Sequence, residues 1–326
     1  MALTLVEAAK YSNNILQVGV IEKLVYQDPI LEKLQWKTIL GNGLTYDVEA
    51  TMSGAGFYSV GDTWVESTST VDQTTATTTI LGGDADVDNF LKATRSDVQD
   101  LMTEQITAKT KAIKDKFMVM FYYGYVTADP KGFTGLHGLI KSQTSPYANT
   151  VCVATVSGTG ILLSLTKLEE AVDAIKNGKG QLICMSKAMR RAINKYLRGV
   201  GGVTYMDAGQ GRIQELFGIP VAVSDYIIDT EDATKDYGDG TYGFNYTVGT
   251  AKSTTSDAAT SIFVLQFAPE AVCGIQSLPI TVDPIGKLET KDAERVRIKW
   301  YPGLMLQNIV TVSKVSGILV AGTVAA

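Results

Sequence analysis

The sequence predicts an α+β fold in which a long hairpin, a long helix and a unit of alternating helices and strands follow one another. A run of threonine and serine over residues 44–81 favours extended backbone, residues 95–125 have helical periodicity, and helical and strand patterns alternate over residues 151–265. The 326 residues are 45% hydrophobic and 19% charged, which is enough apolar surface for one large core or two modest ones. No unbroken apolar stretch reaches the about 20 residues that cross a bilayer, so we expect a globular chain with no membrane partner.

Residues 1–40 are expected to form an extended arm with short helical pieces. Their apolar residues recur at mixed spacings, and Asp28-Pro29 interrupts the pattern because the residue before a proline avoids the helical region. Such a segment has little core of its own.

Residues 44–81 are predicted to form a long projecting β-hairpin. Nine of the thirteen residues from Ser67 to Thr79 carry a hydroxyl group, and β-branched threonine favours extended backbone. The strands lack the aliphatic face that would bury them in their own domain. The alternative is a disordered low-complexity loop.

Residues Arg95 to Tyr125 carry the strongest helical pattern, which at about 1.5 Å per residue predicts a rod of about 45 Å. We interpret the apolar stripe of this helix as core packing and not as a cofactor site. The stripe consists of Val98, Met102, Ile106, Ile113, Phe117, Met120 and Phe121.

Residues 151–265 are predicted to form an α/β unit, followed by strands that return to the chain end. Asp229 to Ser261 is expected to be a polar surface loop. The predicted helices are Leu165–Asn177 and Ser186–Arg198, and the predicted strands are Gln181–Met185, Pro220–Ser224, Ile262–Phe267, Ala271–Leu278, Arg295–Trp300 and Met305–Val315. In the stretch from residue 295 to 300 the basic residues alternate with Val296, Ile298 and Trp300, which predicts one charged and one apolar face.

The sequence contains no complete motif for binding a nucleotide or a calcium ion. Gly238–Gly243 matches GxGxxG, but polar loops flank it where a dinucleotide site needs a strand and a helix. Asp84, Asp86 and Asp88 begin like a calcium loop, which lacks the required glycine and glutamate at its later positions. We therefore expect neither cofactor.

The sequence also gives little support for a metal site or for nucleophilic catalysis. His137 is the only histidine, lies in a predicted turn, and would have to serve any catalytic triad. Cys152, Cys184 and Cys273 have no CxxC spacing. An enzyme with an unrecognised pair of carboxylates stays open, because two acids that meet in space need not be close in sequence.

The net charge of −5 gives the chain no general basic excess that would draw it to nucleic acid. The concentrated basic patch lies on the helix Ser186–Arg198, where Lys187, Arg191 and Lys195 are spaced at i, i+4 and i+8. A solvated face, or one that meets acidic residues of another subunit, is the favoured interpretation, and phosphate contact is the alternative.

The order of these parts resembles the major capsid proteins of tailed bacteriophages with the Hong Kong 97-type fold. The resemblance covers nearly the whole chain. Its sharpest stretches are Leu40–Tyr46, Ile80–Asp88, Phe133–Leu136, Met189–Arg191, Phe217–Val221 and Val296–Leu304.

The resemblance implies a division of the chain into five parts. Residues 1–40 would be the N-terminal arm, 41–83 the extended E-loop, and 84–150 the peripheral domain with its spine helix. Residues 151–265 would be the axial domain around each capsomer centre. Residues 266–326 would return through both domains.

The implied function is that of a non-enzymatic structural subunit. It would assemble with itself into hexamers and pentamers of an icosahedral shell enclosing double-stranded DNA, be made in the bacterial host cytoplasm and end in the virion. The implied partners are a separate scaffolding protein, a portal protein, a possible decoration protein and, without specificity, the packaged DNA. The residues expected at the assembly interface are Tyr58, Trp64, Val65, Thr75, Thr77, Arg295, Arg297 and Lys299.

Two sequence features distinguish this chain from other proteins that the resemblance brings in: encapsulins and covalently locked phage shells. Encapsulins, which enclose enzymes, use the same fold, but we see no encapsulin-like N-terminal helix, and 326 residues is long for that class. Some phage shells of this fold are locked by an isopeptide bond from an E-loop lysine. No lysine or arginine lies between Thr38 and Leu91, so we expect shells held by noncovalent contacts.

Overall fold

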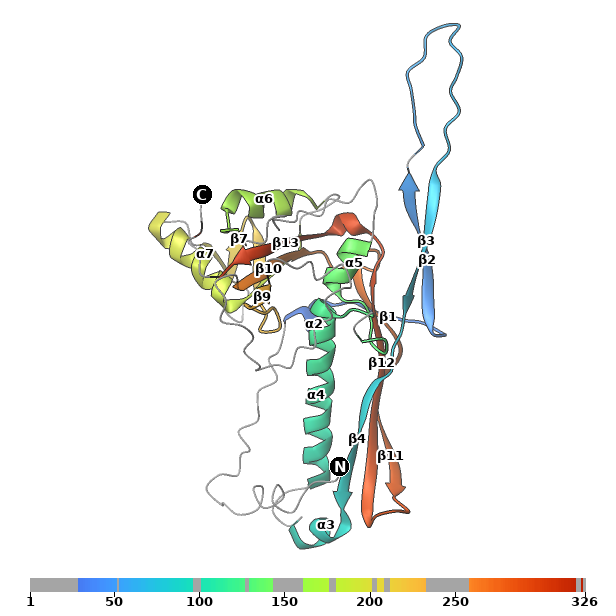
Figure 1. Cartoon of the computed structure of the whole chain (residues 1–326), viewed down its shortest axis with the longest axis vertical. Helices are drawn as coiled ribbons and strands as arrows, with labels where there is room; N and C mark the ends of the chain where they lie inside the picture. The colour runs from blue at the N-terminus through green and yellow to red at the C-terminus, as the bar shows by residue number, and fades with distance from the viewer. Residues whose placement is uncertain are drawn as a thin grey trace.

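The computed structural model describes residues 29–51, 53–95, 101–126, 129–142, 161–175, 180–200, 204–207, 212–232, 258–320 and 324. Most of the predicted N-terminal arm lies outside them. Within residues 29–40 the chain forms α2 (Pro29–Lys33) and β1 (Trp36–Thr38). Figure 1 shows an elongated molecule with an α/β body, a helix running beside a narrow sheet, and a hairpin that projects away from both.

The predicted hairpin is present, with shorter strands than expected. β2 (Gly43–Thr51) pairs antiparallel with β3 (Thr70–Thr77) as a separate two-stranded sheet. Residues 53–69 form a long loop beyond the strands, so only part of the predicted range 44–81 is paired. At the base, Tyr46 and Ala76 join a small apolar cluster with β11 and β12. The hairpin is therefore attached to the core only at its base.

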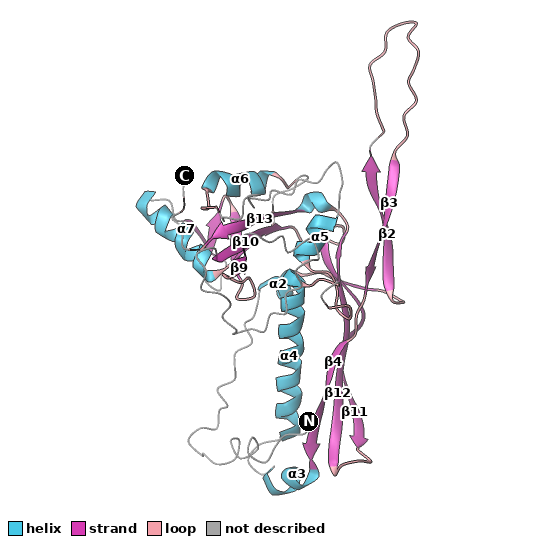
Figure 2. Cartoon of the chain, viewed as in Figure 1, coloured by secondary structure: helices cyan, strands magenta, loops and turns pink. Residues whose placement is uncertain are grey.

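A four-stranded sheet with the order β1-β11-β12-β4 runs alongside the long helix (Figure 2). Its members besides β1 are β11 (Val272–Lys287), β12 (Ala293–Leu306) and β4 (Leu81–Asp88). The predicted alternation on β12 is confirmed, since Val296, Ile298 and Trp300 are buried. β4 was not expected as a strand, and both β11 and β12 extend beyond their predicted ends.

The predicted helix Arg95–Tyr125 differs from the structure in three respects: Arg95 belongs to a separate short helix, residues 96–100 lie outside the described residues, and the long helix ends at Tyr123. Arg95 is the last residue of α3 (Asn89–Arg95), and the long helix α4 spans Leu101–Tyr123, which gives a rod of about 35 Å. Gly124 comes directly after α4 and packs against the backbone oxygens of Met120 and Phe133, so a Cβ at this position would clash with them. The chain therefore turns sharply at this glycine.

A seven-stranded sheet forms the α/β body, with the order β13-β10-β5-β8-β7-β6 and β9 paired to β10. The strands are β5 (Leu182–Met185), β6 (Thr204–Asp207), β7 (Arg212–Leu216), β8 (Ile219–Val223), β9 (Glu231–Asp232), β10 (Ala258–Leu265) and β13 (Val312–Leu319). A short 3₁₀ turn, η1 (Ile309–Thr311), precedes β13. The predicted helices of this unit and the predicted strands Gln181–Met185, Pro220–Ser224 and Ile262–Phe267 are confirmed with differences at their ends. The predicted strand Met305–Val315 is wrong, because β12 ends at Leu306 and β13 begins only after the 3₁₀ turn.

Helices cover both faces of this sheet. α6 (Leu165–Asp173) and α7 (Lys187–Val200) pack on one face through a cluster that includes Leu168, Met189 and Ile193. The C-terminal half of α4 and the short helix α5 (Leu136–Ser142) contribute to the larger cluster on the other face, together with Phe263. This larger cluster also contains residues of β12. One core therefore joins the α/β body to the narrow sheet.

The expectation of a polar surface loop over Asp229 to Ser261 is wrong at both ends of that stretch. Glu231 is 2% exposed, and Thr260 and Ser261 are fully buried. Residues 233–257, which include the GxGxxG match, lie outside the described residues. Among the helices that the structure does describe, none is long and apolar enough to span a membrane.

Candidate subunit interface

The far end of the hairpin exposes a group of apolar side chains. Phe57 and Val60 are fully exposed, and Trp64 and Val65 are about three-quarters exposed. The ring of Tyr58 stacks on Trp64 with 4.4 Å between centroids, and its hydroxyl accepts a hydrogen bond from the Val65 N–H at 3.2 Å. We call these five residues the aromatic tip. Large apolar side chains gathered at an exposed end are typical of a surface that contacts another molecule.

The strands behind the tip are polar on the outside. Thr75 and Thr77 are exposed, and the Thr75 hydroxyl hydrogen-bonds that of Thr45 across the strands at 3.1 Å. The Gln73 amide donates to Asp47 at 3.3 Å. Every charged residue between Lys37 and Lys92 is acidic. The hairpin therefore presents an apolar tip on an acidic, hydroxyl-rich shaft.

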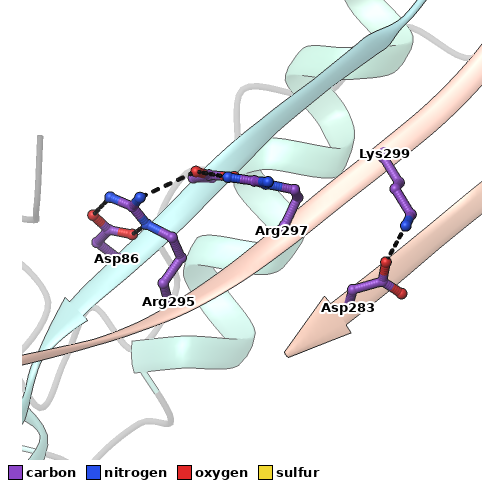
Figure 3. Close-up of polar contacts among 6 residues, drawn as sticks. Asp86, Asp283, Arg295, Arg297 and Lys299 are labelled. Atoms are coloured by element: carbon purple, nitrogen blue, oxygen red, sulfur yellow. Dashed lines mark hydrogen bonds and ion pairs between the residues drawn. The ribbon is translucent and has the colours of Figure 1, made fainter. Parts of the chain in front are cut away.

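Two arginines and a lysine of β12 form a ladder of ion pairs with their neighbouring strands (Figure 3). Arg295 donates to both carboxylate oxygens of Asp86 at 2.7 and 2.6 Å, and Arg297 likewise to Asp84 at 2.7 and 2.9 Å. Lys299 lies 2.5 Å from an oxygen of Asp283 on β11. The three basic residues share one face as predicted, and acids of the same chain balance their charges.

The ladder changes the titration of its acids. Hydrogen bonds from Arg297 hold the pKa of Asp84 below its usual value, and those from Arg295 do the same for the pKa of Asp86. Each arginine lies directly opposite its aspartate in the β4–β12 register. These aspartate partners were not predicted from the sequence, although acids alternate along β4 with the same period of two as the bases along β12.

The basic helix α7 is only partly neutralised. Lys187 pairs with Asp225 at 2.6 Å, while Arg191 and Lys195 are exposed. Asn194 exchanges hydrogen bonds with Gln214 of β7. α7 thus keeps a basic outer face.

The residues weighed for catalysis or metal binding are buried or make local hydrogen bonds, where the structure describes them. His137 lies in α5 and is 1% exposed, so the predicted turn is wrong. Cys184 and Cys273 are buried and form no disulfide within the described residues, and Cys152 falls outside them. Asp88, the third acid of the calcium-like run, accepts from the Phe90 N–H at the start of α3. In the described part of the chain no group of histidine, cysteine and acidic residues could hold a metal ion.

Comparison with known proteins identifies the fold. The sequence matches no family model and no curated protein. Solved structures match along almost the whole chain: the SrpI encapsulin of Synechococcus elongatus (TM-score 0.64, 14% identity, 99% of this chain and 98% of that one) and a chain of Mycobacterium phage Adephagia (TM-score 0.59, 14% identity, 100% and 99%). The capsid chain of an empty GTA particle matches with a TM-score of 0.59 and 12% identity over 89% of both chains. The chain has a Hong Kong 97-type fold.

The comparisons confirm the resemblance at the level of the fold and correct one argument. The SrpI encapsulin aligns over 98% of its own chain with 99% of this one. Chain length therefore does not separate this protein from encapsulins. The assembly roles of Tyr58, Trp64, Val65, Thr75, Thr77, Arg295, Arg297 and Lys299, and the five-part division of the chain, stay predictions.

Proposed function

We propose that the chain is a major capsid protein, which assembles with itself into hexamers and pentamers of an icosahedral shell around double-stranded DNA. The observation that carries the proposal is the hairpin: in a chain with this fold, it projects from the rest of the molecule, and the residues of its aromatic tip join none of the core clusters found among the described residues. Single exposed apolar residues are ordinary, but a group at the end of a projecting element favours a docking partner. A closed homo-oligomer supplies that partner as another copy of the same chain.

The charge of the hairpin supports a neighbouring subunit as its partner. An acidic hairpin favours a surface that carries basic residues, and this chain exposes Lys109, Lys114 and Lys116 on α4. Burial of the aromatic tip would supply most of the contact energy, because large aromatic residues dominate interface energetics. The charges would set register and orientation.

The other expected partners follow from the role of a container. A net charge of −5 suits a shell that must not bind its DNA tightly, since each phosphate contact would resist packing and ejection. The exposed bases of α7 would provide weak contact without sequence specificity. We propose a separate scaffolding protein, a portal protein and a possible decoration protein as further partners, assembly in the bacterial cytoplasm, and a final place in the virion. The subunit would act without catalysis.

A substitution at the aromatic tip tests the proposal. The chain, expressed alone or with its scaffolding protein, should sediment as capsomers or closed particles, and Trp64→Ser should shift it to smaller species at unchanged thermal stability. Phe90→Ser is the matched control, because Phe90 is a 64% exposed aromatic residue outside the hairpin. Equal assembly of Trp64→Ser and wild type would overturn the role of the tip, and a strictly monomeric wild type would overturn the function.

A nanocompartment that encloses protein is the second candidate. The structure of the SrpI encapsulin complex favours it, since the TM-score of 0.64 exceeds that of the two phage-type chains described above. Native particles distinguish the two candidates. Nuclease-protected double-stranded DNA would support the capsid, and a co-purifying protein cargo without nucleic acid would support the compartment.

A further inference from the structure

Five polar side chains meet inside the core where α4 joins the α/β body. They are Tyr123 of α4, His137 of α5, Glu231 of β9, Ser261 of β10 and Lys314 of β13, and we call them the joint cluster. Each is at most 4% exposed. Tyr123 and the neighbouring Phe263 belong to the large apolar cluster that joins the two halves of the molecule. The joint cluster is thus a polar island within the apolar contact between the long helix and the sheet.

Glu231 is the centre of this island. The Tyr123 hydroxyl donates a hydrogen bond to one carboxylate oxygen of Glu231 at 2.5 Å, and the Ser261 hydroxyl donates one to the other oxygen at 2.6 Å. The Tyr123 hydroxyl also accepts from the Ile228 N–H at 3.2 Å. One tyrosine at the end of α4 is therefore tied both to Glu231 and to the backbone that leads into β9.

Basic groups approach the same carboxylate. The Nε2 of His137 lies 3.8 Å from the oxygen that Tyr123 contacts, and the imidazole stacks on the Tyr123 ring at 5.1 Å. The His137 ring also meets Phe263 edge-on at 5.0 Å, which fixes its orientation. Lys314 attracts the carboxylate from β13. On the acidic side, Asp229 repels it, and Asp229 is itself attracted by Arg191 of α7.

The balance of these groups favours a proton on Glu231. Complete burial raises the pKa of Glu231 to about 7, against the lowering effect of Ser261, Tyr123 and Lys314. Burial also raises the pKa of Asp229, which gives the region a second acid that resists ionisation. A protonated carboxyl keeps its hydrogen bonds, because each hydroxyl partner can rotate to accept as well as donate.

We propose that the joint cluster is a proton-dependent lock between α4 and the seven-stranded sheet. With Glu231 neutral, the carboxyl group joins Tyr123 to Ser261 without bringing a charge of its own into the core, and α4 is held against the sheet. With Glu231 ionised, the same contacts enclose a carboxylate away from water, and opening of the joint is favoured. This lock goes beyond the proposed shell function and does not depend on it.

The pH range of the lock follows from linkage. A group whose pKa is raised by folding stabilises the closed joint fully below its ordinary pKa of 4.5, and this stabilisation is lost as pH rises through about 7. The equilibrium constant for opening should therefore rise by up to about tenfold per pH unit between pH 4.5 and 7 and level off above pH 7.

Amide hydrogen exchange of the whole protein, corrected for intrinsic exchange rates, measures this opening. Peptides covering residues 119–124 and 226–232 should lose at least about tenfold in protection between pH 5 and 8 in the wild type. Glu231→Gln keeps the shape and stays neutral, so it should remain protected at every pH. Glu289→Gln is the matched control, because Glu289 is exposed and should leave the wild-type profile unchanged. The same pH dependence in Glu231→Gln, or none in the wild type, would overturn the lock.

A second measurement covers the case in which the glutamine variant fails to fold. In wild-type protein labelled with ¹³C-glutamate, infrared spectra should contain a carboxylic-acid band that titrates near pH 7. Titration of all glutamates near 4.5 would overturn the proposal.

Discussion

Arg295 and Asp86 lie opposite each other on β12 and β4, and the guanidinium bonds both oxygens of a carboxylate that is only 6% exposed. The hydrogen bonds keep the carboxylate ionised and hold its pKa below 3.8. Because folding lowers this pKa, the pair stabilises the fold above the unfolded value of 3.8, and the contribution is lost as pH falls through the lowered folded value.

Replacement of Arg295 by glutamine should raise the pKa of Asp86 and lower the free energy of unfolding near pH 7. The difference from the wild type should shrink below about pH 4, where Asp86 becomes protonated in the variant. Carboxyl NMR and denaturant unfolding over pH 3–7 measure both effects. Lys195→Gln, at an exposed site on α7, is the control. An unchanged pKa of Asp86 would show that the ladder does not form in solution.

Among the elements, α4 packs through one central aromatic residue, Phe117, which contacts three other rings. The Phe117 ring is fully buried and lies 5.5 Å from the Trp36 ring, 4.7 Å from Trp300 and 5.4 Å from Phe133. These rings come from β1, β12 and the turn after α4. Phe117 thus connects the helix to the narrow sheet on one side and to the turn that follows α4 on the other.

Phe117→Ala should destabilise the protein by about 3–5 kcal/mol, because it removes a large buried ring and leaves a cavity. Phe57→Ala removes the same ring from a fully exposed position and should change stability by less than about 0.5 kcal/mol. Chemical denaturation of the two variants provides the comparison. Equal effects would mean that the described packing of α4 is wrong.

The hairpin can be shortened without touching its base. The Gly54 N–H donates to the Ser67 hydroxyl at 2.7 Å, so the two ends of the loop between them lie close together. Replacement of residues 55–66 by two glycines should leave the unfolding transition intact, because Tyr46 and Ala76 keep their contacts. The same variant should fail to form particles in electron microscopy. Loss of cooperative unfolding would instead place the loop in the core.

The elements differ in how far the sequence predicts them. The hairpin follows from the β-branched threonines, and the buried and charged faces of β12 follow from its period of two. Both predictions are confirmed. β4 was missed because its Asp84 and Asp86 are unfavourable in strands until Arg297 and Arg295 pair with them. Glu231 was placed in a polar loop, since burial of its carboxyl group depends on hydrogen bonds from Tyr123 and Ser261, which are far away in sequence.

At the scale of the whole molecule, the absence of lysine from residues 38–91 constrains how copies can be joined. Amine attack on a neighbouring amide needs a lysine close to its target. Lys37 lies in β1 and Lys92 in α3, and Figure 1 shows the far end of the hairpin well away from both elements. Particles boiled in SDS under reducing conditions should run as a single band near 35.0 kDa. A ladder of covalent multimers would contradict this, and peptide mapping would identify the lysine used.

The measurement that tests the central proposal most directly is a cryo-electron microscopy reconstruction of purified native particles after nuclease treatment. The account predicts a closed icosahedral shell with groups of five and six subunits, the hairpin of each subunit lying on its neighbour, and double-stranded DNA inside. Particles filled with protein and free of nucleic acid would contradict the capsid function in favour of the compartment. A chain that stays monomeric, with its aromatic tip in solvent at every concentration, would contradict the shell itself.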